Sequence, residues 1–84
     1  MKVVLITGCS TGIGLATAVQ FSEGDYQVIA TARNPKSSEE LVELGRRENV
    51  VLKELDVCDQ VSVDKLFDEL SNFEIDVLIN NAGI

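Results

Sequence analysis

The fold is decided by residues 3–14, which read Val-Val-Leu-Ile-Thr-Gly-Cys-Ser-Thr-Gly-Ile-Gly. The unbroken apolar run from Val3 to Ile6 is typical of a strand buried on both faces of a parallel sheet. A glycine-rich turn follows, and residues 15–21 then have the pattern of a helix. Glycine lets the backbone turn sharply, and a helix N-terminus offers unpaired N–H groups and the positive end of the helix dipole. This order of elements therefore predicts a pyrophosphate site.

The glycines of the turn are spaced as Thr7-Gly8-x-x-x-Gly12-Ile13-Gly14. This differs from the strict Gly-x-Gly-x-x-Gly of many dinucleotide-binding folds, and the lack of Gly-Lys-Ser/Thr argues against a nucleoside-triphosphate loop. The alternative is a turn that joins a strand to a helix and binds nothing. Its position between these two elements favours the binding interpretation. The turn residues that we predict to contact a cofactor are Gly8, Ser10, Thr11, Gly12, Ile13 and Gly14.

The composition limits the class of protein. With 84 residues, 45% of them hydrophobic, the chain is predicted to be a single small domain over residues 1–84. Its net charge of −7 argues against a nucleic-acid partner or an anionic membrane surface. No apolar run reaches the length of a membrane span, and the apolar start reads as a strand and not as a signal peptide. A cytoplasmic location is expected by default.

The cysteines do not indicate a disulfide framework or a metal site. Cys9 and Cys58 each follow a predicted strand, and we expect these strands to be too far apart for a bridge. The chain contains no histidine, so a zinc site is not expected. Cys9 has no histidine to activate it as a nucleophile, and we interpret it as a small residue that fills the loop.

Strands and helices alternate along the whole chain, which predicts a parallel sheet. With right-handed crossovers we expect an α/β fold of three layers with four strands in the order 3-2-1-4, the first part of a dinucleotide-binding fold. The first two helices should cover one face and the third the other. The expected strands are residues 3–7, 26–32, 49–55 and 75–79; the expected helices are 12–23, 35–46 and one capped by Asp59 or Ser62 that ends near 72.

Apolar residues at helical spacing predict which helix faces point inward. The third helix carries one apolar stripe at i, i+3, i+4 and i+7. The predicted inward residues are Leu15, Ala16, Ala18 and Val19 in the first helix, Leu41 and Leu44 in the second, and Val63, Leu66, Phe67 and Leu70 in the third.

The end of the second strand predicts the choice of cofactor. An NAD site carries an acid about 20 residues past the glycines, which accepts hydrogen bonds from the ribose. This chain has Arg33 there instead, following Ala-Thr-Ala. A guanidinium can hold a 2′-phosphate, with the Ser10 hydroxyl and Lys36 as further donors, which favours NADP over NAD. The alternative is a solvated surface arginine.

The Thr-Gly-x-x-x-Gly-Ile-Gly turn and the segment Asn80-Asn81-Ala82-Gly83 are in register with the short-chain dehydrogenase/reductase family, which the chain resembles along its whole length. The resemblance implies that Asp56 accepts a hydrogen bond from the adenine amino group and that the Val57 backbone reads the ring edge. It also implies that residues 81–83, which are Asn81, Ala82 and Gly83, lie against the ribose. By themselves, Asp56 could be a loop residue that caps the next helix, and 80–83 an ordinary turn.

One departure from the family decides the expected mechanism. The family uses a Tyr-x-x-x-Lys pair and a serine, whereas the one tyrosine here, Tyr26, is followed at position 30 by alanine. We therefore predict no catalytic residue in this chain, which corresponds to the amino-terminal half of the family's domain. The stretches Gly-Cys-Ser-Thr-Gly-Ile-Gly-Leu-Ala-Thr-Ala and Ala-Thr-Ala-Arg-Asn-Pro are similar to the hydroxysteroid- and retinol-dehydrogenase-like branch.

The expected function is to bind NADP(H), mostly through its adenosine half, as the cofactor-binding half of an oxidoreductase. One alternative is a split enzyme in which a second chain supplies the tyrosine and lysine. Another is a minimal or engineered structural or interaction module with weak nucleotide affinity. Because one helix must cover one whole sheet face, we also expect self-association, either as a homodimer or as aggregation, through that face or the edge of the fourth strand.

Overall fold

A computed structural model describes residues 1–81 of the chain. The elements occur in the predicted order, except that the second helix is divided into a short 3₁₀ turn and an α-helix. In chain order the elements are β1 (Lys2–Thr7), α1 (Gly12–Ser22), β2 (Tyr26–Ala32), η1 (Pro35–Ser37), α2 (Glu39–Leu44), β3 (Val50–Glu54), α3 (Gln60–Glu69) and β4 (Val77–Asn80).

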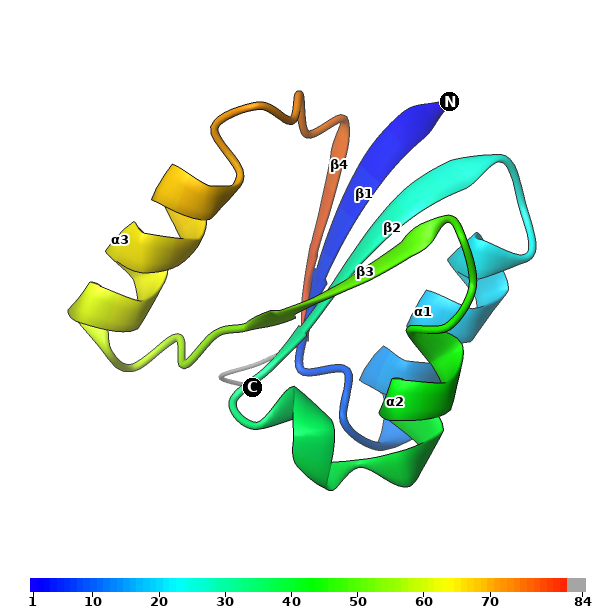
Figure 1. Cartoon of the computed structure of the whole chain (residues 1–84), viewed down its shortest axis with the longest axis horizontal. Helices are drawn as coiled ribbons and strands as arrows, with labels where there is room; N and C mark the ends of the chain where they lie inside the picture. Colours follow the sequence, from blue (N-terminus) through cyan, green and yellow to red (C-terminus); the bar gives the residue numbers. More distant parts are fainter. Residues whose placement is uncertain (82–84) are drawn as a thin grey trace.

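The four strands form one parallel sheet in the order β3-β2-β1-β4, which confirms the predicted topology. Val4 of β1 pairs with Val28 of β2 on one side and with Val77 of β4 on the other. Helices α1 and α2 cover one face of the sheet, and α3 lies on the opposite face (Figure 1). The parallel direction brings the carboxyl ends of all strands to one edge, where ligands bind in open α/β sheets.

The core has a layer on each face of the sheet. Val4 and Ile6 of β1 are fully buried in the layer under α1 and α2, whereas Leu5 points into the layer under α3. Residues that alternate along a strand point to opposite faces. The unbroken apolar run of β1 thus fills both layers, as predicted.

Two residues of the predicted inward faces are exposed instead. The buried line of α1 is Gly14, Ala18 and Ser22, and Ala16 lies away from it. In α3, Leu66 is buried but Phe67 is 66% exposed. Consecutive helical residues are rotated by about 100°, so the residue after Leu66 leaves the contact with the sheet.

The boundaries of the helices differ from expectation for local reasons. Ser38 has an extended backbone (φ −103°, ψ 111°), which separates η1 from α2. The residue after Leu44 is Gly45, and α2 therefore ends before Arg46. Asp59 caps α3 by accepting a hydrogen bond from the N–H of Val61, and this helix ends at Glu69.

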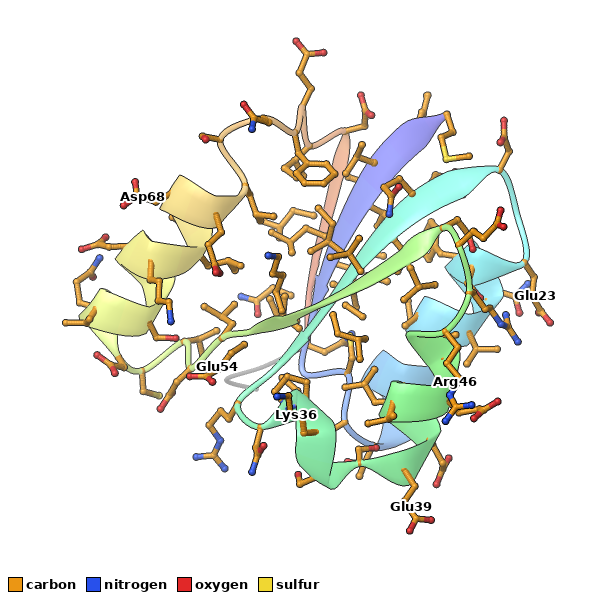
Figure 2. All side chains as sticks on the ribbon, in the orientation of Figure 1. Glu23, Lys36, Glu39, Arg46, Glu54 and Asp68 are labelled. Carbon is orange, nitrogen blue, oxygen red and sulfur yellow. The ribbon has the colours of Figure 1, made fainter. Side chains whose placement is uncertain are left out.

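Charged side chains lie around the outside of the molecule. Glu23, Glu39 and Asp68 point away from the sheet (Figure 2). Within residues 1–81, none of the helices has both the length and the hydropathy that crossing a bilayer requires.

Candidate functional site

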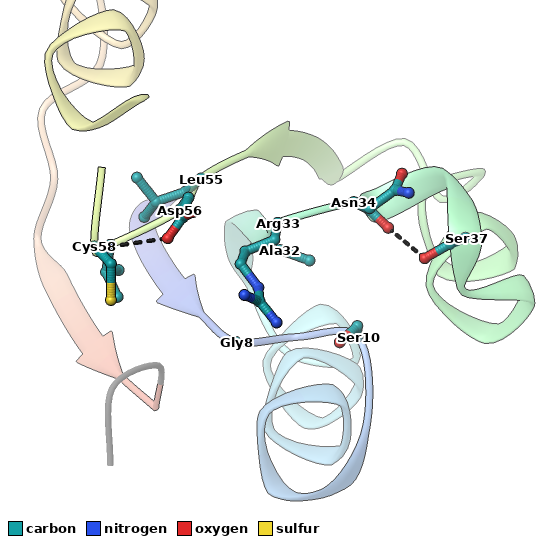
Figure 3. Close-up of a pocket in the computed structure, with 10 residues that line it drawn as sticks. Gly8, Ser10, Ala32, Arg33, Asn34, Ser37, Leu55, Asp56 and Cys58 are labelled. Carbon is teal, nitrogen blue, oxygen red and sulfur yellow. Dashed lines mark hydrogen bonds between the residues drawn. The ribbon is translucent and has the colours of Figure 1, made fainter. Parts of the chain in front are cut away.

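A cavity of about 680 Å³ lies at the carboxyl ends of the first three strands. Its walls come from the turn after β1, the segment after β2 and the loop after β3 (Figure 3). The lining residues are Gly8, Ser10, Ala32, Arg33, Asn34, Ser37, Leu55, Asp56, Val57 and Cys58.

The turn after β1 requires its glycines for two different reasons. Gly8 and Gly12 have φ values of 67° and 61°, in the left-handed region that favours glycine. Gly14 instead permits close packing, because a Cβ atom there would lie 1.9 Å from the carbonyl oxygen of Gly8. A Cβ atom on Gly12 would have no heavy atom within 4 Å, so this part of the turn faces open space.

The N-terminus of α1 is suited to an anion. Thr11 precedes the helix in an extended conformation, and its side chain makes no capping hydrogen bond. The first turn of α1 contains no acidic residue. The first N–H groups of the helix and the positive end of its dipole are therefore available to a negatively charged group.

The second wall carries the positive charge of the site. Arg33 follows β2 directly and is exposed, and its guanidinium points toward the turn that contains Gly8 and Ser10 (Figure 3). The backbone beside it is fixed, because the N–H of Leu55 donates to the carbonyl of Ala32 over 2.9 Å. The charge therefore lies next to an ordered strand end and faces the turn that leads into α1.

The third wall is a tight turn after β3. Asp56 accepts a hydrogen bond from the N–H of Cys58 at 3.0 Å, and its own N–H donates to the hydroxyl of Ser62 at 2.9 Å. Because Asp59 caps α3, the alternative that Asp56 caps this helix is wrong. Asp56 is half-buried at the cavity wall, where a carboxylate can accept from a ligand.

The end of β4 is tied to the end of β1. The hydroxyl of Thr7 donates to Oδ1 of Asn80 at 2.8 Å and accepts from the N–H of Asn81 at 3.0 Å. Within residues 1–81, the buried Nδ2 of Asn81 has no hydrogen-bond partner. The predicted contacts of Ala82 and Gly83 lie outside the described residues.

The two cysteines differ in burial and in their place relative to the cavity. Cys9 is fully buried, its N–H donates to the carbonyl of Thr31, and its Sγ donates to the carbonyl of Ile6. Burial raises the pKa of the Cys9 thiol to about 11, so the thiol is neutral at pH 7. Cys58 is exposed, and both cysteines are free. Within residues 1–81, no group of His, Cys, Asp and Glu is arranged to hold a metal ion.

The structure brings together only part of the predicted set at this cavity. Gly8, Ser10, Arg33, Asp56 and Val57 line it, and the residues 11–14 form the adjacent start of α1. Lys36 does not line this cavity and instead lines a neighbouring groove together with Lys53 and Lys65, so its role as a second cation stays a prediction.

Sequence reasoning missed several residues of the cavity. Asn34, Ser37 and Cys58 line it, although no binding role was predicted for them. Their position in the segments after β2 and β3, which also contain Arg33 and Asp56, could have indicated them, since loops at the carboxyl edge of a parallel sheet surround the ligand.

Comparisons with known proteins agree with this geometry. A family model described as short chain dehydrogenase matches residues 2–84. Retinol dehydrogenase 8 from Bos taurus is 38% identical over 89 residues, which cover 99% of this chain and 28% of the relative. The NADP-dependent 3-hydroxy acid dehydrogenase YdfG from Salmonella typhi is 39% identical over 85 residues, with 98% of this chain and 34% of the relative covered.

A solved structure has the same fold. The carbonyl reductase from Pseudomonas aeruginosa PAO1, in complex with NADP, has a TM-score of 0.92 and is 38% identical. The match covers 100% of this chain and 39% of that chain. The chain therefore spans about a third of the length of the proteins it matches.

Proposed function

This chain belongs to the short-chain dehydrogenase family, and from that premise we propose that residues 1–84 form the NADP(H)-binding half of an oxidoreductase domain. The observation that carries the proposal is the position of Arg33. Its guanidinium points toward the turn of Gly8 and Ser10, which borders a cavity of about 680 Å³ at the carboxyl edge of the sheet and leads into the uncapped N-terminus of α1. Two anionic groups of one ligand can therefore be held on opposite walls.

The walls fit the parts of a dinucleotide phosphate. The N–H groups at the start of α1 would hold the pyrophosphate, because Gly12 leaves open space and no side chain caps the helix. Arg33 and the Ser10 hydroxyl would hold the 2′-phosphate. Asp56 and the Val57 backbone would hold the adenine, and residues 81–83 would lie against the ribose. The bound nicotinamide would supply the hydride chemistry.

Two of the similar proteins favour NADP. The carbonyl reductase that shares the fold was solved with NADP, and the YdfG relative is described as NADP-dependent. The strand end that would carry an acid in an NAD site carries Arg33 here. The absence of Tyr-x-x-x-Lys from the 84 residues leads us to propose that this segment does not transfer hydride by itself.

Calorimetric titration with NADP⁺ and NAD⁺ tests the proposal. Arg33→Ala should lose about 1–3 kcal/mol of NADP⁺ affinity, because a charged hydrogen-bond donor to the 2′-phosphate is removed. Its affinity for NAD⁺ should hardly change. Lys36→Ala removes the same charge from the neighbouring groove and should leave both affinities nearly unchanged.

Two results would contradict the proposal. Equal losses for NADP⁺ and NAD⁺ in Arg33→Ala would remove the 2′-phosphate role of Arg33. No binding of either dinucleotide by the folded parent chain would remove the cofactor function, and an interaction module would then be the better interpretation.

We also propose a homodimer through the face of the sheet that carries α3. An apolar groove of about 290 Å³ lies there, bordered by the exposed side chains of Phe67 and Leu78. β4 pairs with β1, and within residues 1–81 no strand pairs with its other edge. A second copy would cover apolar surface that this part of the chain leaves open. The cytoplasmic location stays a prediction.

A further inference from the structure

One serine hydroxyl connects two walls of the cavity. The hydroxyl of Ser38 donates to the carbonyl of Ser10 at 2.9 Å. The same oxygen accepts from the N–H of Leu41 at 3.2 Å and so caps α2. A hydroxyl has one proton to donate and two lone pairs to accept with, so Ser38 can make both bonds at once.

The two bonds join segments that are distant in sequence. Ser10 belongs to the turn after β1, and Ser38 lies 28 residues later, directly after the cavity residue Ser37. The segment that leads to Ser38 begins at Arg33. The bond between Ser38 and Ser10 therefore fixes the distance between the turn and the segment that carries the guanidinium.

The turn needs such a tie at Ser10 more than at its two ends. Cys9 is held by the bond from its N–H to the carbonyl of Thr31, whereas Ser10 is followed by Thr11 and by Gly12, and glycine restricts the backbone least. The start of α1 is held separately, because Gly14 packs against the Gly8 backbone and the N–H of Leu15 donates to the carbonyl of Thr11. Loss of the Ser38 bond would free the Ser10 peptide and leave the helix N-terminus in place.

We propose that Ser38 is a positioning residue that holds the Ser10 peptide opposite Arg33 and thereby contributes to selection of the dinucleotide that carries a 2′-phosphate. The selectivity part rests on the proposed function. Ser38 does not line the cavity and acts through Ser10. It should therefore affect the 2′-phosphate more than the pyrophosphate, which the N–H groups of α1 would hold.

Three variants separate this role from general stabilisation. Ser38→Ala removes the tie and the cap, and Ser38→Thr keeps a hydroxyl that can make both bonds. Ser22→Ala is the matched control, because Ser22 links the opposite end of α1 to the residues after α2. There the Ser22 hydroxyl donates to the carbonyl of Val19 and accepts from Nη1 of Arg47.

The first measurement is ¹⁵N relaxation of each variant without ligand. In Ser38→Ala, the backbone order parameters of residues 10–12 should fall from the value of about 0.85 typical of rigid backbone to below about 0.6, because the Ser10 peptide loses its tie. Ser38→Thr and Ser22→Ala should keep the order parameters of the parent over these residues. A change confined to Leu41, as expected from loss of the cap alone, would overturn the proposal.

The second measurement is titration of each folded variant with NADP⁺ and NAD⁺. Ser38→Ala should bind NADP⁺ about fivefold more weakly, with NAD⁺ changed by less than about twofold. Ser38→Thr should restore the parent value, and Ser22→Ala should match it. Equal weakening for both dinucleotides would overturn the selectivity role.

The two proposals fail in different ways. If the parent chain binds neither dinucleotide, the proposed function is wrong and the selectivity role falls with it, whereas the relaxation measurement still decides whether Ser38 holds the turn. If the parent binds NADP⁺ and Ser38→Ala binds it equally well, the proposed function stands and the role of Ser38 is wrong.

Discussion

Replacement of Gly14 by alanine tests how closely α1 approaches β1. The added Cβ atom would lie 1.9 Å from the carbonyl oxygen of Gly8 and 2.7 Å from its carbonyl carbon. Both are backbone atoms that cannot rotate away, so the start of the helix must move. Alanine favours a helix over glycine by at most about 1 kcal/mol, and overpacking costs about 1–3 kcal/mol or more. We expect the free energy of unfolding to fall by about 2 kcal/mol, measured by urea denaturation followed by circular dichroism.

Two other glycines provide the controls. A Cβ atom on Gly24 would lie 3.5 Å from Cδ2 of Tyr26, which is an ordinary contact, so Gly24→Ala should change stability by less than about 1 kcal/mol. Gly12 has open space but a φ of 61°, so Gly12→Ala should cost about 1–2 kcal/mol through backbone strain. The expected order of loss is Gly14, then Gly12, then Gly24. A Gly14→Ala variant as stable as Gly24→Ala would refute the close approach of α1 and β1.

Two further predictions concern the buried thiol and the apolar groove. Burial raises the pKa of Cys9 from 9.0 to about 11, so the stability that its neutral form contributes is complete below pH 9 and is lost as the pH rises through 11. Urea denaturation of the parent and of Cys9→Ala between pH 8 and 11 should therefore show a steeper loss of stability with pH in the parent. Parallel curves for the two proteins would contradict this. Phe67→Glu should weaken self-association in sedimentation experiments with little loss of stability, because Phe67 is 66% exposed beside the groove. Val61→Glu is its control, since Val61 is exposed on the same helix outside that groove; equal effects of the two changes would argue against the groove as the interface.

The topology and the first wall of the site follow from sequence because they depend on local pattern. An apolar run without polar breaks, as in β1, indicates a strand of a parallel sheet that is buried on both faces. The spacing of the glycines from Gly8 to Gly14 indicates a tight turn before a helix. The packing of Gly14 on Gly8 and the left-handed backbone of Gly12 give these glycines their physical reasons. Arg33 was found for the same reason, since it is the residue at the end of a strand.

The errors arise where tertiary contacts decide. Periodicity predicted Phe67 and Ala16 as inward residues, but the width of a buried stripe depends on how much of the helix the sheet covers. Lys36 is three residues from Arg33, and the η1 turn directs the two cations into different grooves. No local pattern could show that the Ser38 hydroxyl reaches Ser10, because that bond joins segments 28 residues apart.

The central place of β1 has a consequence for how the chain is made. β1 is synthesised before the other described elements, and its partner on one side, β4, is the last of the four described strands, so that Val4 pairs with Val77 across an intervening segment that contains all the other elements. Until residues 77–80 have left the ribosome, one row of N–H and C=O groups on β1 has no native partner. The nascent polypeptide must protect that row while the intervening segment is made, and closing so long a loop is the slow kind of step in folding.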